Sequence, residues 1–265
     1  MQNNLKILQI KNLSKYFGGL AAVSKCSLTI KKGSITGIIG PNGSGKTTLF
    51  NLIAGNLKAS DGEVIFNNEN ITNYPSYELF SKGLLRTFQI AHEFTNLTVL
   101  ENLMMVPGNQ SGERLITALL KPKLVKKEEE VVKNKAYEVI EFLNLKHLAN
   151  ELAGNLSGGQ KKLLELGRTM MVDAKIVLLD EVGAGVNRTL LKDIGTAILR
   201  LNKEKGYTFC MIEHDMDFIS RMCDPVIVMA DGSVLFEGTP DQVKTNEKVI
   251  ESYLGRGSKN LEGNY

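Results

Sequence analysis

A glycine-rich segment with fixed spacing constrains the fold of this chain more than any other feature. Residues 40–47 read Gly-Pro-Asn-Gly-Ser-Gly-Lys-Thr and fit the pattern G-x-x-x-x-G-K-[ST]. The segment follows the apolar run Ile35–Ile39 and opens a helical pattern over Lys46–Ala54. In a strand–loop–helix unit of this kind, the glycines let backbone N–H groups turn inward around phosphate oxygens. We therefore expect a phosphate-binding loop at the end of a buried strand.

The side chains of this loop have predictable roles. Lys46 is expected to reach the β and γ phosphates of a nucleotide as a point charge, and Thr47 to offer its hydroxyl to Mg²⁺. The N-terminus of the following helix adds about half a positive charge. The predicted nucleotide-binding residues of the loop are Asn42, Gly43, Ser44, Gly45, Lys46, Thr47 and Thr48.

Several short apolar runs predict the rest of the fold. Continuous rather than alternating apolar character is typical of parallel strands that are buried on both faces. Helical patterns such as Gln160–Val172 separate the runs, which favours an α/β sheet with crossover helices. Asp231-Gly232 predicts a hairpin turn, and we expect this hairpin and the first 35 residues, with their own short strands, to form an antiparallel β patch beside the main sheet. The predicted main strands are Ile35–Ile39, Ile176–Leu179, Thr208–Ile212 and Val226–Met229.

The pattern predicts one domain over residues 1–240, with its core at about 1–85 and 157–240. Residues from about 86 to 156 are expected to form an inserted helical subdomain, in which the charged stretch Lys121–Lys135 is a solvated helix face. The tail, residues 241–265, is expected to carry one short helix near Lys248–Leu254 and a loose polar end.

Composition narrows the function classes. The 265 residues are 43% hydrophobic and 23% charged with a net charge of +3, which excludes a disordered chain and argues against a nucleic-acid partner. Cys26, Cys210 and Cys223 have neither disulfide nor metal-ligand spacing, so we expect small buried hydrophobes. The first residues do not resemble a signal peptide, and no apolar window of about 18 residues predicts a membrane span.

Two carboxylates follow the apolar run Ile176–Leu179. Ligands bind at the carboxyl ends of strands in open α/β sheets. We expect Asp180 to hold Mg²⁺ there, directly or through water. Glu181 is expected to orient and deprotonate a water that attacks the γ-phosphate.

Residues 156–160, Leu-Ser-Gly-Gly-Gln, predict a second anion site. Ser157 and Gln160 have the spacing of a capping box, and the helix behind them has an apolar core face. The helix N-terminus is therefore expected to face solvent. A cap alone would not need two glycines, each of which costs up to about 1 kcal/mol in a helix. The simplest use is to bind, through Ser157, Gly158, Gly159 and Gln160, a phosphate held by another copy of the fold.

With these residues, the chain resembles the ATP-binding subunits of ABC transporters over nearly its whole length, and residues 156–160 match the signature motif of that family. The resemblance implies that Gln89 is the glutamine that contacts Mg²⁺ and the membrane partner. It implies that His214 contacts the γ-phosphate and that Phe17 stacks on adenine, with Tyr16 as the competing choice.

Five further segments are similar to the ATPases of branched-chain amino acid importers. The resemblance implies ATP and Mg²⁺ as cofactors, a second ATP-binding subunit, two permease subunits and an external solute-binding protein. It also implies a peripheral position on the cytoplasmic face of the inner membrane. The segments are Gly18–Val23, Arg86–Gln89, Leu97–Leu103, Ala184–Asn187 and Ile212–Met216.

Two residues depart from the wider family. Val182 stands where most members have proline after the catalytic glutamate, so we expect a more mobile loop there. Asn187 stands where many members have aspartate, which we interpret as a mark of the subfamily.

The expected mechanism is ATP-driven dimerisation, with ATP between the phosphate loop of one copy and the Ser157 helix of the other. The surface around Ile90–Phe94 is the candidate permease dock. Three alternatives stay open: a non-transport ATPase of similar design, a small-molecule kinase, and the same cassette serving urea, lipid or lipopolysaccharide transport.

Overall fold

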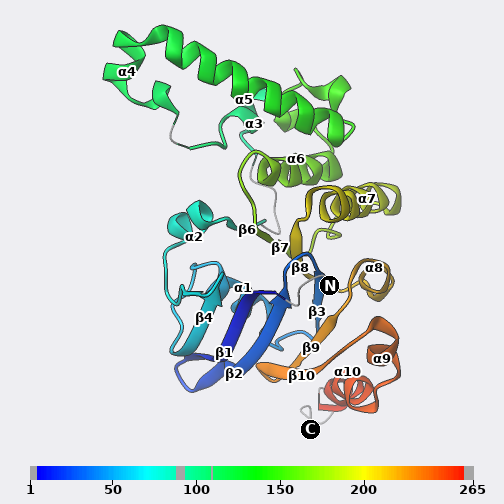
Figure 1. Cartoon of the computed structure of the whole chain (residues 1–265). Helices are drawn as coiled ribbons and strands as arrows, with labels where there is room; N and C mark the ends of the chain where they lie inside the picture. The colour runs from blue at the N-terminus through cyan, green and yellow to red at the C-terminus, as the bar shows by residue number, and fades with distance from the viewer. Residues whose placement is uncertain (1–4, 88–92, 109, 260–265) are drawn as a thin grey trace. The chain divides into compact units, whose positions relative to one another are not determined.

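The structure, a computed structural model, describes residues 5–87, 93–108 and 110–259, with the backbone alone for 255–259. The chain divides into two compact units (Figure 1). The first, here the sheet unit, comprises Met1–Arg86, Lys175–Gly183 and Leu199–Tyr265. The second, here the helical unit, comprises Thr87–Ala174 and Ala184–Ile198.

The main sheet of the sheet unit has six strands in the order β10-β9-β3-β8-β7-β6. Every neighbouring pair is parallel except β9 and β10, which form an antiparallel hairpin. All five residues of β3, β7 and β8 are buried, which confirms the expectation of parallel strands covered on both faces. The strands are β3 (Ile35–Ile39), β6 (Leu84–Arg86), β7 (Ile176–Asp180), β8 (Thr208–Ile212), β9 (Val226–Ala230) and β10 (Ser233–Gly238).

A second, antiparallel sheet has the order β2-β1-β4-β5. The predicted turn at Asp231-Gly232 is confirmed, but its place in this sheet is wrong: β10 pairs with β9 and extends the main sheet, because the edge of β9 away from β3 is open to it. The first two strands are also long rather than short. Their bounds are β1 (Lys6–Phe17) and β2 (Leu20–Lys31), followed by β4 (Asp61–Phe66) and β5 (Glu69–Asn70).

Apolar side chains from both sheets and from α1 (Lys46–Ile53) form the core of the sheet unit. Helix α1 directs Leu49, Phe50 and Ile53 into this core, so its N-terminal end is held at the end of β3. The remaining helices of the unit are α2 (Ser76–Lys82), α8 (Met216–Met222), α9 (Pro240–Thr245) and α10 (Glu247–Lys259).

The C-terminal segment is more regular than predicted. The helix expected near Lys248–Leu254 runs from Glu247 to Lys259 and follows a separate helix, α9. Thr239 and Gln242 form a capping box on α9, and Pro240 occupies its first turn, where a missing N–H costs nothing.

The helical unit contains α3 (Val99–Met104), α4 (Leu115–Leu120), α5 (Pro122–Phe142), α6 (Gly158–Met170) and the first part of α7 (Arg188–Lys205). Helix α6 packs against α3 and α5 so closely that a Cβ at Gly167 would lie 2.8 Å from the Leu143 side chain. Residues 157–174 therefore group with the helical unit, whereas the sequence-based boundary assigned them to the core.

The three cysteines are free and buried, as expected. Burial raises the pKa of the Cys26 thiol to about 11, and it also raises the pKa values of Cys210 and Cys223. In the part of the chain that the structure describes, no helix combines the length and apolar character needed to cross a membrane.

Asn102 is a fully buried polar residue that organises the entry to α3. Its Oδ1 accepts a hydrogen bond from the Phe94 N–H at 2.9 Å. Its Nδ2 lies 3.0, 3.2 and 2.9 Å from the carbonyl oxygens of Phe94, Leu97 and Thr98. The amide thus gives the Phe94 N–H a partner and links three carbonyl oxygens that also accept from backbone N–H groups.

We expect Asn102→Asp to destabilise the helical unit by about 2–4 kcal/mol, because a buried carboxylate would face backbone carbonyl oxygens. Urea unfolding followed by far-ultraviolet circular dichroism measures the effect. The exposed Asn155→Asp serves as a control and should change stability by less than about 0.5 kcal/mol. Equal midpoints for the two variants would contradict the role assigned to Asn102.

Candidate functional site

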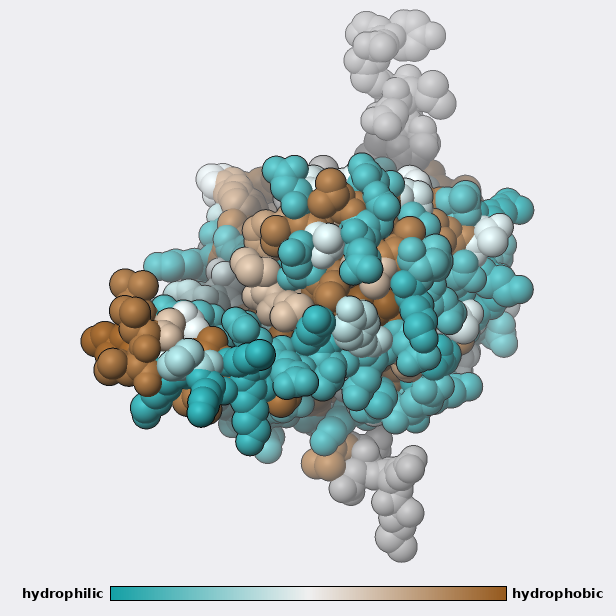
Figure 2. All heavy atoms as spheres, turned by 90° about the horizontal axis from the view of Figure 1, so that it is seen from above, coloured by the Kyte–Doolittle hydropathy of each residue, from teal (hydrophilic) through white to brown (hydrophobic). Residues whose placement is uncertain are grey.

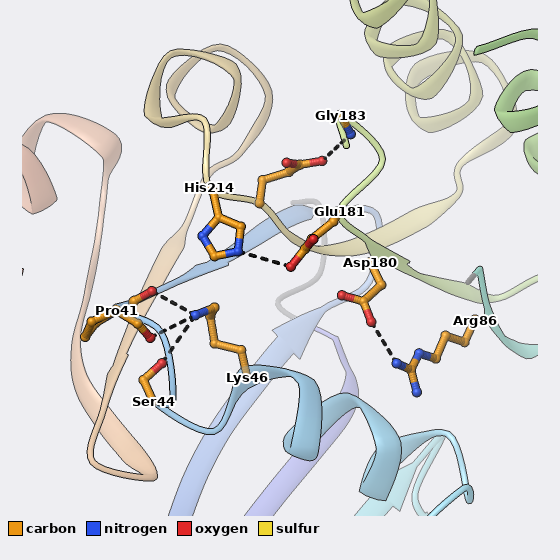
Figure 3. A network of polar contacts seen from close by, with 10 residues as sticks. Pro41, Ser44, Lys46, Arg86, Asp180, Glu181, Gly183 and His214 are labelled. Atoms are coloured by element: carbon orange, nitrogen blue, oxygen red, sulfur yellow. Dashed lines mark hydrogen bonds and ion pairs between the residues drawn. The ribbon is translucent and has the colours of Figure 1, made fainter. Parts of the chain in front are cut away.

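The phosphate-loop motif lies where the sequence predicts it, between β3 and α1. The Lys46 ammonium turns back into the loop and donates to the carbonyl oxygens of Gly40 at 2.8 Å and Pro41 at 3.1 Å (Figure 3). It also lies 3.4 Å from the Ser44 hydroxyl. Lys46 is only 6% exposed, so these oxygens compensate a charge that has lost most of its water.

Two glycines of the loop are required by backbone packing. A Cβ at Gly40 would lie 2.1 Å from the Met229 carbonyl oxygen, and one at Gly45 would lie 2.4 Å from the Ala22 carbonyl oxygen. Gly45 also has a φ of +96°, which side chains rarely adopt. The loop is therefore held between β2 and β9 in one shape.

The N-terminus of α1 suits an anion. No side chain caps Gly45, and the first turn contains no acidic residue. Asn42, Gly43 and Thr47 are exposed at this end of the helix. Backbone N–H groups and a buried ammonium thus converge on one surface, which fits the phosphate chain of a nucleotide.

Asp180 ends β7 and is 4% exposed. Its Oδ2 accepts a hydrogen bond from Arg86 Nη2 at 2.7 Å (Figure 3). Arg86 Nη1 donates to Asn51 Oδ1. Arg86 ends the neighbouring strand β6, so the sheet itself brings the two charges together. A carboxylate is the type of ligand that Mg²⁺ prefers.

Glu181 follows Asp180 in a strained conformation. Its φ is +49°, an uncommon value for a residue with a side chain that costs about 1–3 kcal/mol. Its N–H donates to the Ile212 carbonyl oxygen at 2.9 Å, and its Oε1 lies 3.1 Å from His214 Nε2. The structure therefore brings Glu181 and His214 together, as their predicted roles require.

The loop after Glu181 has fixed attachments in spite of the missing proline. Val182 is buried, and the Gly183 N–H donates to the Glu213 carboxylate at 2.8 Å. Glu213 is itself 5% exposed. The expected mobility caused by Val182 is thus opposed by an anchor that the next strand supplies.

Neither candidate for adenine stacking is a core residue. Tyr16 and Phe17 are each 48% exposed, and the Lys15 ammonium lies 5.2 Å from the centre of the Phe17 ring. Phe17 is the last residue of β1. Both rings offer a surface for stacking, and the choice of Phe17 stays a prediction.

The capping box at the start of α6 is confirmed. The Ser157 N–H donates to Gln160 Oε1 at 2.9 Å, and the Gln160 N–H donates to Ser157 Oγ at 3.4 Å. Ser157 and Gly158 are exposed, but Gly159 is buried, and a Cβ there would lie 1.9 Å from Leu190 Cδ2. Packing against the Leu190 side chain of α7 therefore gives a second reason for glycine at position 159, and its contact with a phosphate stays a prediction.

Asn187 has a local structural role. Its Oδ1 accepts a hydrogen bond from the Leu190 N–H at 2.9 Å and so caps the first turn of α7. Asparagine and aspartate both make such a cap, which accounts for the substitution without a charge. Gln89 and most of the predicted dock at Ile90–Phe94 lie outside the described residues.

Arg86 and Glu213 lie in the segments Arg86–Gln89 and Ile212–Met216, but the sequence predicts no role for either residue. Their partners lie at the end of β7 (Asp180) and in the turn after it (Gly183). The apolar pair before Arg86 is the signal that indicates a strand end there. Tyr253 on α10 was also missed. Burial raises the pKa of its phenol, and a hydrogen bond with the Gly40 backbone opposes this rise.

Comparisons with known proteins agree with this geometry. A family model described as ABC transporter matches residues 23–184, more than half of the chain. A model described as branched-chain amino acid ATP-binding cassette transporter matches residues 233–259.

A probable branched-chain amino acid transport ATP-binding protein LivG of Archaeoglobus fulgidus is 45% identical, with 97% of this chain and 99% of that protein covered. The solved ADP conformation of an ATP-binding cassette of an ABC transporter is 42% identical, covers 95% of this chain and 99% of its own, and has a TM-score of 0.80. A dimeric post-hydrolysis cassette bound to ADP and phosphate is 26% identical over 88% of this chain and 99% of its own, with a TM-score of 0.72.

The fold of this chain is thus shared with ATP-binding cassettes of known structure. The chain belongs to the ABC transporter family, as an ATP-binding cassette of the group that contains the branched-chain amino acid transport ATP-binding proteins.

Proposed function

We propose that this chain is the ATP-binding and hydrolysing subunit of an importer for branched-chain or related amino acids. One observation carries the ATPase part: the Lys46 loop, Asp180, Glu181 and His214 follow the carboxyl ends of three adjacent strands, β3, β7 and β8. The names of the relatives and the match of residues 233–259 support the cargo class.

Nucleotide binding would use charges that are already in place. The bound nucleotide with Mg²⁺ supplies the scissile phosphoanhydride bond and the charge that must be stabilised. Lys46 and the N–H groups at the start of α1 would hold the phosphates, with Asn42, Gly43, Ser44, Gly45 and Thr48 around them. Thr47, Asp180 and Gln89 are the proposed Mg²⁺ ligands, and Phe17 would stack on the base.

Glu181 is the proposed general base. Its carboxylate would accept a proton from the attacking water, and its left-handed backbone together with the 3.1 Å contact to His214 fixes where Oε1 points. His214 Nε2 would help to position both the carboxylate and the γ-phosphate. The anchor between Glu213 and Gly183 keeps the loop behind Glu181 in register.

The exposed start of α6 is the proposed site for the nucleotide of a second subunit. Ser157 and Gly158 present a capped helix N-terminus to solvent, and a relative of this fold is a dimer in its post-hydrolysis state. Binding across the dimer would make closure depend on the γ-phosphate, because both subunits would contact it. Gly159 and Gln160 would maintain the shape of this turn.

The remaining assignments are proposals of the same kind. The cassette would occupy residues 1–240, the helical insertion about 86–156, and the tail 241–265. The segment around Ile90–Phe94 would contact permease subunits on the cytoplasmic face of the inner membrane, with a solute-binding protein outside.

Reconstitution tests the proposal directly. The protein would be assembled in proteoliposomes with the permease subunits encoded beside its gene, with ATP enclosed on the cassette side. We expect ATP-dependent uptake of radiolabelled leucine delivered by the partner binding protein. ATP hydrolysis without leucine uptake, but with uptake of urea, would reject the cargo class and leave the ATPase intact.

We expect Glu181→Gln to keep ATP binding and to lower turnover by about 10²- to 10⁴-fold, because the amide cannot accept a proton. The variant should accumulate as a dimer in ATP, which size-exclusion chromatography detects. Glu130→Gln, an exposed change on α5, should leave both properties unchanged. A monomeric Glu181→Gln variant with normal hydrolysis would remove Glu181 from its role.

We expect Ser157→Arg to leave the ATP affinity of the isolated subunit nearly unchanged and to abolish turnover. Thr239→Arg is the matched control, since it removes the equivalent capping box of α9 at a similar cost of about 1 kcal/mol. Loss of nucleotide affinity in monomeric Ser157→Arg would show that the α6 site acts within its own subunit.

The buried pair of Arg86 and Asp180 should be strongly coupled. We expect Arg86→Gln and Asp180→Asn each to lower the free energy of unfolding by about 3–5 kcal/mol, and the double variant to lose clearly less than the sum. The exposed pair of Arg200 and Glu204 provides the comparison cycle, with a coupling of about 0–1 kcal/mol. Additive losses at Arg86 and Asp180 would contradict a structural ion pair.

A further inference from the structure

Helix α4 presents four large apolar side chains to solvent. Its six residues, Leu115–Leu120, include no buried residue. Figure 2 shows a compact hydrophobic group at the left edge of the molecule, over the helix that Figure 1 labels α4. Its aliphatic members are Leu115 (83% exposed), Ile116 (74%), Leu119 (80%) and Leu120 (75%). Contiguous exposed apolar surface of this kind marks an interaction site rather than a solvated face.

The segment that precedes α4 is held by hydrogen bonds to its neighbours. The Ser111 N–H and hydroxyl donate to the two carboxylate oxygens of Glu128 on α5, at 2.9 and 2.8 Å. The Gln110 side-chain amide donates to the carbonyl oxygens of Met104 at 3.2 Å and Pro107 at 2.9 Å. The apolar group therefore lies on a helix that hydrogen bonds connect, through Ser111, to α5.

The backbone of α4 is suited to an environment with little water. The Ala118 N–H donates to the Arg114 carbonyl oxygen at 2.9 Å, and the Lys121 N–H donates to that of Thr117 at 2.8 Å. These bonds satisfy within the helix polar groups that would be costly in an apolar medium.

Basic residues predominate in α4 and the segment that follows it, whereas acidic residues lie just outside this stretch, at Glu113 and at Glu128–Glu130. Residues 114–127 contain five basic residues and no acidic residue, although the whole chain is nearly balanced at 32 basic and 29 acidic residues. All five basic side chains belong to exposed residues: Arg114, Lys121, Lys123, Lys126 and Lys127. Exposed aliphatic side chains bordered by lysines are typical of segments that bind at the surface of an anionic bilayer.

We propose that α4 and its basic border, residues 114–127, dock on anionic phospholipid. Leu115, Ile116, Leu119 and Leu120 enter the boundary between headgroups and acyl chains, and the basic residues contact lipid phosphates. The contact is reversible, because one turn and a half of helix buries little area. It gives the cassette an attachment to the membrane that is separate from any permease.

Vesicle sedimentation with the full chain tests the proposal. We expect the protein to sediment with vesicles of equal parts phosphatidylcholine and phosphatidylglycerol, and much less with phosphatidylcholine alone. The bound fraction should fall as salt rises, since screening shortens the reach of the lysines to about 3 Å at 1 M. Equal binding to both kinds of vesicle, or none to either, would overturn the proposal.

Paired variants assign the contact to α4. Leu115→Ser combined with Leu119→Ser should reduce partitioning at least tenfold, and Lys123→Glu combined with Lys127→Glu should reduce it similarly. The controls are Leu254→Ser, on an equally accessible leucine of α10, and Lys203→Glu, on an exposed lysine of α7. Unchanged ATP hydrolysis in solution shows that each variant is folded. Vesicle binding by the α4 variants at the wild-type level would reject the lipid assignment. This outcome does not depend on whether the variants assemble with permeases.

A fluorescent label reports the depth of the contact. Leu119→Cys can be labelled selectively with an environment-sensitive thiol reagent, because the native cysteines are buried and their thiols have raised pKa values. Emission should shift to shorter wavelength on the anionic vesicles for Leu119→Cys and stay constant for Leu254→Cys. A shift on self-association without vesicles would instead identify a second copy as the occupant.

Discussion

The hydrogen-bonded position of β8 between β3 and β7 is the constraint on which the site depends. Ile212 pairs with Ile38 on one side and with Asp180 on the other, so three strand ends meet at one edge. From that edge β3 leads into the phosphate loop, β7 into Glu181, and β8 into His214. The contact between Glu181 and His214 follows from this register, because a shift of β8 would separate the two side chains.

Buried charge is organised before any ligand binds. Lys46 is neutralised by carbonyl oxygens of its own loop, and Asp180 by a guanidinium from the next strand (Figure 3). Both charges are therefore held in place by protein groups rather than by water, as in a preorganised electrostatic site. Arg86 is also the last residue of the first segment of the sheet unit, before the chain enters the helical unit. One ion pair thus connects Asp180, the proposed Mg²⁺ ligand, to the residue at which that segment ends.

The loop, the parallel strands and the α6 cap could be predicted because each is a local pattern. Gly40–Thr47, Ile176–Glu181 and the box at Ser157 contain within a few residues the spacing that defines them. The roles of Arg86 and Glu213 could not be predicted, since their partners are brought near only by strand order.

Features that depend on packing between distant residues also could not be predicted from the sequence. One reason for Gly159 lies in Leu190 on another helix, and the assignment of α6 to the helical unit depends on contacts with α3 and α5. The position of β10 at the edge of the main sheet is likewise decided by the free side of β9. The signals for these features are distributed over residues that are distant in the chain, so no single segment contains them.

The contact between Gly159 and Leu190 has a mechanical consequence. A Cβ at Gly159 would overlap the Leu190 side chain, so the turn at Ser157 packs directly against the first turn of α7, which Asn187 caps. A subunit that met either turn would meet the other in the same motion. Binding between two subunits would then be cooperative, because a second subunit would have to contact both turns at once.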